Sequence, residues 1–309
     1  MWIQNETSVK EFILLGFTSH PTLQRILLTL CLVIYLITLF GNSLIIFLIW
    51  VDSRLHTGMY FFIANLSFLD IFGTQVTYPQ MLFHMASRTN NISFNRCMAQ
   101  LLLTLFCGMA ECFILAVMAY DRYVAICQPL RYPTIMRMQV CILMAVACWL
   151  VGFFNAAALT VITLSFPFCG PNEINHFFCE EPAVLQLVCM DTYIVKVLIF
   201  TLSVLVLMLP FTFIVISYIY IARVVFSIKS ARGRQRAFST CATHLTVVTM
   251  FYTTIGFTYL QPRSEQAADQ EKTASVFYAF FSPMVNPVIY SLRNKDVKGA
   301  LFKVMGKVS

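Results

Sequence analysis

The sequence predicts an all-α membrane protein, a bundle of seven membrane-spanning helices, and three observations carry that prediction. Hydrophobic residues make up 59% of the 309 residues and charged residues only 11%, where a soluble domain is roughly a quarter charged. The mean hydropathy is +0.76. Apolar runs recur along the chain, each near the roughly 20 residues that a helix needs to cross a bilayer. The runs are continuous and do not alternate, which excludes a transmembrane β-barrel.

The spans are expected, in chain order, at residues 26–50, 59–82, 98–120, 140–162, 196–222, 238–261 and 272–292. The first five are clear. Thr, Ser and His interrupt the last two, yet both stay free of charge when they are trimmed at Arg236 and Lys272. Polar but uncharged spans suit helices whose polar side faces the interior of a bundle.

The placement of charge sets the expected orientation. With seven spans, two thirds of the 21 Lys and Arg residues fall on the side of the C-terminus, and most of the 14 acidic residues fall on the other. The positive-inside rule therefore predicts a cytoplasmic C-terminus and an extracellular N-terminus. We expect one domain over residues 1–309: an extracellular segment 1–25, a helical bundle 26–292 and a cytoplasmic tail 293–309. The net charge of +7 indicates affinity for anionic membrane lipid and not for nucleic acid. Asn5 in NET is a predicted glycosylation site.

Four of the 11 cysteines gather on the predicted outer face. Cys97 lies at the outer end of the third span, and Cys169, Cys179 and Cys189 lie in one long outer loop. An oxidising outer face favours disulfides, but four cysteines allow three connectivities, so spacing alone leaves the pairing open. A zinc site that includes His176 is the competing interpretation. The length of the loop favours an ordered lid over the bundle.

Two acidic residues fall at membrane depth, Asp70 in the second span and Glu111 in the third. Each costs roughly 2.5–3.5 kcal/mol at the centre of a lone helix, so each should face the interior and find a partner. Asn42 and Asn286 are the nearest polar candidates. A cation site, for which sodium is the candidate ion, a proton-sensitive switch and an ion-free hydrogen-bonded cluster all remain open. Pro287 removes a helix hydrogen bond in mid-span and predicts a hinge.

The segment MAYDRYVAIC, residues 118–127, contains two adjacent residues of opposite charge, Asp121 and Arg122. Counting from Cys97, the helix covers about 37 Å before it reaches Asp121, enough to cross the membrane. The pair is therefore expected at the cytoplasmic edge. Interfacial snorkelling explains Arg122 but does not require an aspartate beside it. An arginine that is paired and then released is a switch element.

Several motifs occur in order and at matching topological places. They are GN at 41–42, MYFFIANLSFLD at 59–70, MAYDRYVAIC at 118–127, HFFCEEPAVLQLVCMDT at 176–192, SYIYI at 217–221, RAFSTCATHL at 236–245 and PMVNPVIYSLRN at 283–294. Over essentially its whole length the chain resembles a rhodopsin-like G-protein-coupled receptor, and more closely an olfactory receptor. One departure is Gly58, where the family usually has proline; glycine should loosen that helix start a little.

The resemblance implies two disulfides, Cys97 with Cys179 and Cys169 with Cys189. It also implies a latch that faces a heterotrimeric G protein. The residues implied in G-protein coupling and switching are Asp121, Arg122, Tyr123, Tyr218, Arg236, Asn286, Pro287 and Tyr290. It also implies a stimulatory olfactory G protein, a rise in cAMP, and a place in the plasma membrane of sensory cilia. No cofactor is expected beyond the candidate sodium ion.

Residues on three spans resemble the odorant-contacting faces of the family. They are Thr104, Leu105, Gly108, Met109 and Cys112, then Leu202 and Val206, then Tyr252, Ile255, Gly256 and Tyr259. Their spacing puts each set on one helical face, although ordinary interhelical packing explains each single residue equally well. No carboxylate is expected near Thr104, which disfavours an amine. A small, neutral, mainly hydrophobic volatile is the expected ligand. It would favour a packing in which the sixth span swings away and Arg122 is freed.

Other classes of protein fit the sequence less well. A transporter or channel would favour repeats in two matching halves, and the sequence has none. An enzyme would need paired catalytic groups at one depth, and His56 and His244 are isolated. A rhodopsin-like receptor for a non-olfactory neutral ligand remains the alternative. Two inner basic segments would flank the G protein, RVVFSIKSARGRQR and LRNKDVKGALFKV. The second is expected to form a short amphipathic helix on the inner leaflet.

Overall fold

The computed structural model describes residues 9–18, 20–87, 89–168, 172–188, 193–259, 272–292 and 295–306. Asn5, Cys169 and Cys189 lie outside the described residues, as do the side chains of Arg236 and Tyr259. The predictions that concern these five residues therefore stay predictions.

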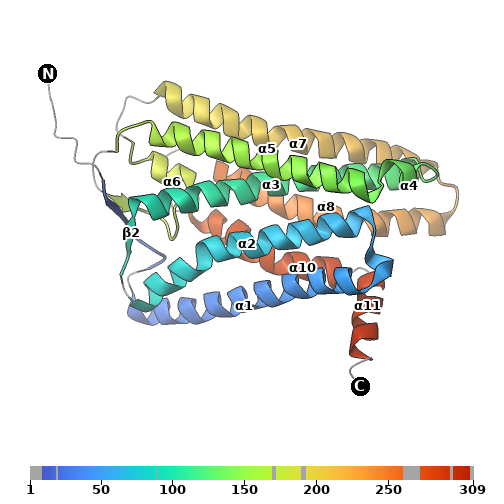
Figure 1. The fold of residues 1–309 in the computed structure, drawn as a ribbon, viewed down its shortest axis with the longest axis horizontal. Coiled ribbons are helices and arrows are strands. Elements are labelled where there is room, and N and C mark those ends of the chain that lie inside the picture. The colour runs from blue at the N-terminus through green and yellow to red at the C-terminus, as the bar shows by residue number, and fades with distance from the viewer. Residues whose placement is uncertain are drawn as a thin grey trace.

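Seven long helical segments run through the described part of the chain, in the order that the apolar runs predict. They are α1 (Pro21–Val51), α2 (Gly58–Ser87), α3 (Phe94–Cys127), α5 (Met138–Leu164), α7 (Tyr193–Ser227), α8 (Ala231–Tyr259) and a last segment made of residues 272–276, the π-helix η2 (Phe277–Phe281) and α10 (Ser282–Leu292). Figure 1 shows the helices running along the long axis of the molecule. The predicted all-α membrane bundle is confirmed.

Five of the described helices are long and apolar enough to cross a membrane: α1, α2, α3, α5 and Phe200–Ser227 of α7. The two remaining segments, α8 and residues 272–292, are the ones that Thr, Ser and His interrupt. Their polar side chains point into the bundle, since His244, Thr258, Ser275 and Asn286 are each at most 2% exposed. These two helices therefore owe their polarity to the bundle interior, as the sequence predicts.

The outward faces of the bundle carry large apolar side chains. Trp50, Leu143 and Phe154 are 77%, 69% and 65% exposed. A continuous apolar exterior marks a surface that another apolar phase covers, which for a bundle of this length is lipid. The helix α3 is the most enclosed, because it packs against α2, α5, α7 and α8. The protein is thus a multi-pass membrane protein organised around α3.

Close helix packing in the bundle depends on small residues. A Cβ added to Gly152 of α5 would lie 2.9 Å from the backbone nitrogen of Ala110 in α3. A Cβ added to Gly41 of α1 would lie 3.1 Å from Cγ of Pro287 in α10. The glycine of the GN motif therefore lets α1 approach the proline of the seventh segment.

A small three-stranded sheet covers one end of the bundle, and the sequence did not reveal it. The strand β1 (Glu11–Leu14) lies between β2 (Asn91–Ser93) and β3 (Glu173–Ile174), antiparallel to the first and parallel to the second. The short helix α6 (Glu181–Leu185) lies at the same end (Figure 1). A disulfide joins Cys97 to Cys179, the pairing that the family resemblance implies. We call this end the sheet end.

The opposite end carries η1 (Ser53–Leu55), α4 (Tyr132–Ile135) and α11 (Lys295–Met305), two of which are labelled in Figure 1. The helix α11 is amphipathic, as predicted: Val297 and Ala300 are buried, whereas Lys298 is exposed. The hydroxyl of Tyr60 donates to Oδ2 of Asp296 at 3.1 Å and so ties α11 to α2. The short helix is therefore docked on the bundle.

Candidate functional site

A cavity of about 120 Å³ lies between α2, α3, α7 and α8. Seven of the predicted ligand contacts line it: Thr104, Leu105, Gly108, Met109 and Cys112 from α3, Val206 from α7 and Ile255 from α8. The helical spacing on α3 therefore predicted correctly which face of this helix lines the cavity. Gly108 enlarges the cavity directly, because a Cβ added there would meet no atom within 4 Å.

The other predicted contacts whose side chains the structure describes are not among the residues that line the cavity. Leu202 and Tyr252 pack against the neighbouring hydrophobic core, where the Tyr252 ring lies 4.8 Å from that of Phe211. Gly256 does not line the cavity either. Phe178 and Tyr278 do line it, and sequence reasoning missed both. The first comes from a loop, and the second from the seventh span, for which the sequence predicted no ligand-contacting face.

Three acidic residues also line this cavity, which corrects one expectation. Glu181 of α6 reaches it from the sheet end, and Asp70 and Glu111 line it from α2 and α3. Glu181 is 2% exposed. The prediction that no carboxylate shares a site with Thr104 is therefore wrong. The carboxylate comes from the loop between α5 and α7, and the span pattern gives no information on where a loop residue folds back.

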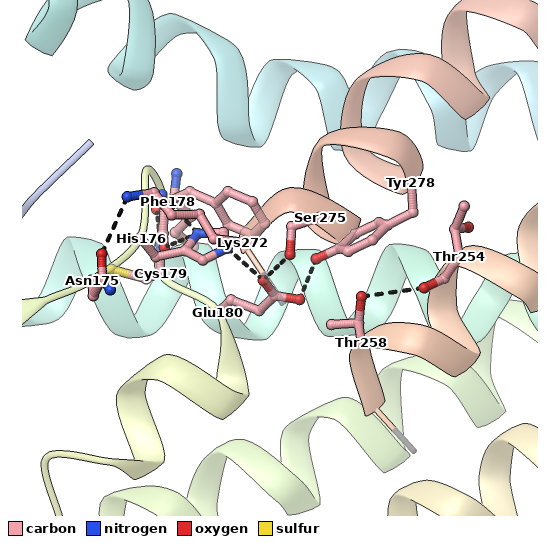
Figure 2. Close-up of polar contacts among 11 residues, drawn as sticks. Asn175, His176, Phe178, Cys179, Glu180, Thr254, Thr258, Lys272, Ser275 and Tyr278 are labelled. Atoms are coloured by element: carbon pink, nitrogen blue, oxygen red, sulfur yellow. Dashed lines mark hydrogen bonds and ion pairs between the residues drawn. The ribbon is translucent and has the colours of Figure 1, made fainter. Parts of the chain in front are cut away.

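A second acidic residue, Glu180, ties this loop to the seventh segment (Figure 2). Ser275 donates to Oε2 of Glu180 at 2.8 Å, and the hydroxyl of Tyr278 donates to Oε1. His176 places Nε2 at 3.0 Å from Oε2 in an ion pair whose side chains are 3% and 4% exposed. Since Cys179 binds Cys97, the loop is fastened to α3 and to the seventh segment at once.

Glu180 is held as a carboxylate by these neighbours. Burial alone would raise the pKa of Glu180, but the hydrogen bond and charge of His176, with the hydrogen bonds from Tyr278 and Ser275, outweigh burial and lower the pKa below its usual value. A buried carboxylate is tolerated when its oxygens are all satisfied in this way. Glu180 is therefore a fixed anionic anchor of the loop.

A polar chain runs from α1 through the seventh segment to α2. Asn42 donates from Nδ2 to the backbone oxygen of Pro283 at 3.0 Å. Asn286 donates from Nδ2 to Oδ2 of Asp70 at 3.0 Å. Glu111 lines the same cavity as Asp70. The sequence named Asn286 correctly as a partner of Asp70, whereas Asn42 bonds to backbone instead. Two carboxylates and a nearby buried amide oxygen, Oδ1 of Asn286, fit the hard-oxygen preference of a sodium ion.

Four of the predicted switch residues, Asp121, Arg122, Tyr123 and Tyr218, lie towards the opposite end of the bundle. Asp121 is 1% exposed, and the hydroxyl of Tyr132 in α4 donates to its Oδ1 at 2.8 Å. In the part of the chain that the structure describes, Arg122 forms no ion pair with Asp121. The charge of Arg122 is close enough to act on Asp121, Tyr218 and His244.

Tyr218 and His244 link α7 to α8. Nε2 of His244 lies 3.1 Å from the backbone oxygen of Leu115, which only accepts. In the neutral imidazole Nδ1 is then the acceptor, and the hydroxyl of Tyr218 donates a hydrogen bond to it at 2.8 Å. Tyr290 is 2% exposed and packs with the same core. Tyr123 lies edge-on to Tyr220, with ring centroids 6.0 Å apart. These residues join α3, α7 and α8 near Arg122.

The alternative metal sites gain no support from the described residues. No three His, Cys, Asp or Glu side chains among them are grouped to hold a metal ion. Cys179 is in a disulfide, and His176 faces Glu180. His56 lies exposed near the backbone of Trp50.

Comparison with known proteins gives one consistent result. The sequence model of a family described as "Olfactory receptor" matches residues 30–307. The chain is 47% identical to a human protein named "Putative olfactory receptor 2B3" over 305 residues, 99% of this chain and 97% of that protein. It is 47% identical to human "Olfactory receptor 2A1/2A42" over 306 residues, 99% of each chain. It is 48% identical to mouse "Olfactory receptor 5P68" over 303 residues, 98% of this chain and 96% of that protein.

Proposed function

The chain belongs to the olfactory receptor family, whose members are odorant-sensing G-protein-coupled receptors and not enzymes, and on that premise we propose how this protein works. A small, mainly hydrophobic volatile molecule binds in the cavity beside α3. Binding activates a heterotrimeric G protein of the stimulatory olfactory type, and the cell's cAMP rises. The protein acts in the plasma membrane of olfactory sensory cilia, with its N-terminus and sheet end outside.

The cavity is the observation that carries this proposal. Its walls are mostly apolar, with a few polar groups that can orient a ligand, which is the usual make-up of a small-molecule site. The predicted contacts on α3, α7 and α8 share it. A ligand there touches three helices whose opposite ends carry Arg122, Tyr218 and His244. One bound molecule can therefore favour one packing of these helices over another.

The switch acts through contacts that exist in only one packing. In the described packing Tyr218 is bonded to His244, and this bond holds α7 against α8. When the ligand favours an outward position of α8, that bond opens and Tyr218 becomes a partner for Arg122. The G protein then binds between α3, α7, α8 and α11. The basic residues near these ends suit an acidic partner surface and the anionic lipid beside it.

A sodium ion is proposed for the Asp70 and Glu111 pair. Their oxygens, with that of Asn286, would hold it, and its charge would offset the repulsion between two carboxylates in one cavity. The ion would support the packing in which α2, α3 and α10 stay together around it. The hydrogen bond from Asn286 to Asp70 already joins α10 to α2 and therefore supports the same packing.

The proposed function is tested by a chemically diverse odorant panel with a cAMP readout in a heterologous cell. Surface expression is measured in parallel, and an empty vector is the control. At least one volatile should raise cAMP in a saturable, receptor-dependent way without a ligand-evoked current in cells that lack olfactory channels. A ligand-evoked current without cAMP would support a channel and contradict the proposal.

A further inference from the structure

We infer that the ligand of this cavity carries a hydrogen-bond donor, a hydroxyl or an amine, and that a carbonyl or ether oxygen alone is a poor match. This inference rests on the proposed function and goes further by naming the chemical class of the odorant. Its basis is that four of the five hydroxyl groups that line the described cavity offer it lone pairs, because their protons are already engaged elsewhere.

Tyr278 is the clearest case. Its single hydroxyl proton is donated to Oε1 of Glu180, and a carboxylate can only accept. The carboxylate cannot turn away, because Ser275 and His176 hold its other oxygen at 2.8 and 3.0 Å. All four side chains lie in the polar cluster of Figure 2. Towards the cavity Tyr278 is therefore an acceptor.

The hydroxyl protons of the three threonines that line the cavity are also engaged in hydrogen bonds. Thr104 donates to the backbone oxygen of Gln100 at 2.8 Å, Thr74 donates to that of Asp70 at 2.6 Å, and Thr77 donates to that of Gly73 at 3.1 Å. A backbone oxygen has no proton to give, so each proton must come from the hydroxyl. All three residues line the cavity and present it with lone pairs.

One carboxylate of the lining adds to this pattern. Glu181 at the sheet end accepts hydrogen bonds when it is ionised. Ser203 is the remaining lining hydroxyl, and no hydrogen bond fixes its proton in the described structure. The thiols of the lining cysteines are weak donors. Among the lining hydroxyl groups and Glu181, acceptors therefore outnumber donors.

A buried ligand oxygen that finds no donor loses its hydrogen bonds to water without replacement, whereas a hydroxyl or amine keeps a partner. The expected consequence is an EC50 that is roughly 10- to 100-fold lower for the donor-bearing member of a matched pair. The alcohol, amine and aldehyde of a series have the same carbon skeleton, and the methyl ether adds one methyl group, so apolar contacts nearly cancel.

The test uses two matched series, hexyl and benzyl, each as the alcohol, the primary amine, the aldehyde and the methyl ether. They are applied with the broad panel to cells in which surface expression is measured. The alcohol or amine should be at least about tenfold more potent than the aldehyde and the ether. An equal or stronger response to the aldehyde or ether overturns the inference and leaves the receptor function standing. No response to any compound at proven surface expression overturns the proposed function, and the inference with it.

Two variants assign the effect to the cavity. Glu181→Gln replaces an acceptor-only group by one with an N–H donor, so the EC50 ratio of aldehyde to alcohol should fall by about tenfold. Tyr278→Phe should weaken the alcohol response more than the aldehyde response. Tyr35→Phe is the matched control, because Tyr35 donates to Gln75 and does not line the cavity. An unchanged ratio in Glu181→Gln at normal surface expression overturns the inference even if Tyr278→Phe fails to fold.

Discussion

The hydroxyl of Tyr132 donates a hydrogen bond to Oδ1 of Asp121 at 2.8 Å. In this packing the aspartate of the DRY sequence is therefore held by a tyrosine ten residues beyond the arginine, and not by the arginine beside it. The position where a Cβ would stand on Gly58 lies 3.0 Å from the same Asp121 oxygen. The start of α2 thus closes over the Asp121–Tyr132 contact.

We expect Tyr132→Phe to destabilise the receptor. Asp121 is buried and would lose its hydrogen bond, and hydrogen bonds to charged groups contribute about 1.5–3 kcal/mol. Thermal unfolding of the purified receptor in detergent measures the loss. Tyr120→Phe is the matched control, because no hydrogen bond of the Tyr120 hydroxyl is found among the described residues. An equal loss in both variants would show that the Asp121–Tyr132 bond contributes nothing specific.

Alanine substitutions at two glycines, one on α5 and one on α3, should affect surface expression differently. Gly152→Ala puts Cβ 2.9 Å from the backbone of Ala110, so α3 and α5 must separate, at a cost of about 1–3 kcal/mol. Gly108→Ala meets nothing within 4 Å and fills only cavity space. Surface expression should fall for Gly152→Ala and stay normal for Gly108→Ala, while Gly108→Ala should change the EC50 for bulky ligands. Normal expression of Gly152→Ala would contradict the packing.

Removing sodium should sensitise the receptor. If Asp70 and Glu111 hold the ion in the resting packing, replacing sodium in the medium by choline should lower the agonist EC50 by about fivefold or more. Asp70→Asn should abolish this dependence. Asp296→Asn removes a carboxylate at the opposite end and should keep it. The same sodium response in wild type and Asp70→Asn would rule out this site.

The Glu180 cluster predicts a pH dependence of stability. The folded pKa of Glu180 lies below its usual value of 4.5, so its contribution is fully present above pH 4.5 and is lost as the pH falls through the folded pKa. Glu180→Gln should cost about 3 kcal/mol at pH 7, because it breaks a buried pair. Unfolding scans from pH 7 downwards should show the difference from wild type constant at first and then shrinking. Glu173→Gln, at an exposed position, is the control. A difference that grows on acidification would contradict the assignment.

Much of the bundle could be predicted because a bilayer imposes a minimum apolar length on each helix. The face of α3 could be predicted for a related reason, since helical spacing puts Thr104, Gly108 and Cys112 in line. Both inferences use only local sequence. Asn286 could be predicted as a partner of Asp70 because it lies at a comparable membrane depth in the seventh span.

The features that were missed depend on contacts between distant segments. The strand β1 has four residues, too few for a visible alternation, and pairs with residues 91–93 and 173–174. Glu181 enters the cavity because the Cys97–Cys179 disulfide and Glu180 fix the loop around it. Sequence spacing says nothing about where such a loop folds back. Tyr132 was missed for the same reason, since adjacency to Asp121 pointed to Arg122.

The central claim is that a ligand in the cavity beside α3 acts through Arg122 near the opposite end of the same helix. The most direct measurement compares the odorant-evoked cAMP response of Arg122→Ala with that of Arg131→Ala, an exposed arginine in the loop before α4. Both are compared with wild type at equal surface expression. The response should be lost in Arg122→Ala and kept in Arg131→Ala. A full response in Arg122→Ala would contradict the claim.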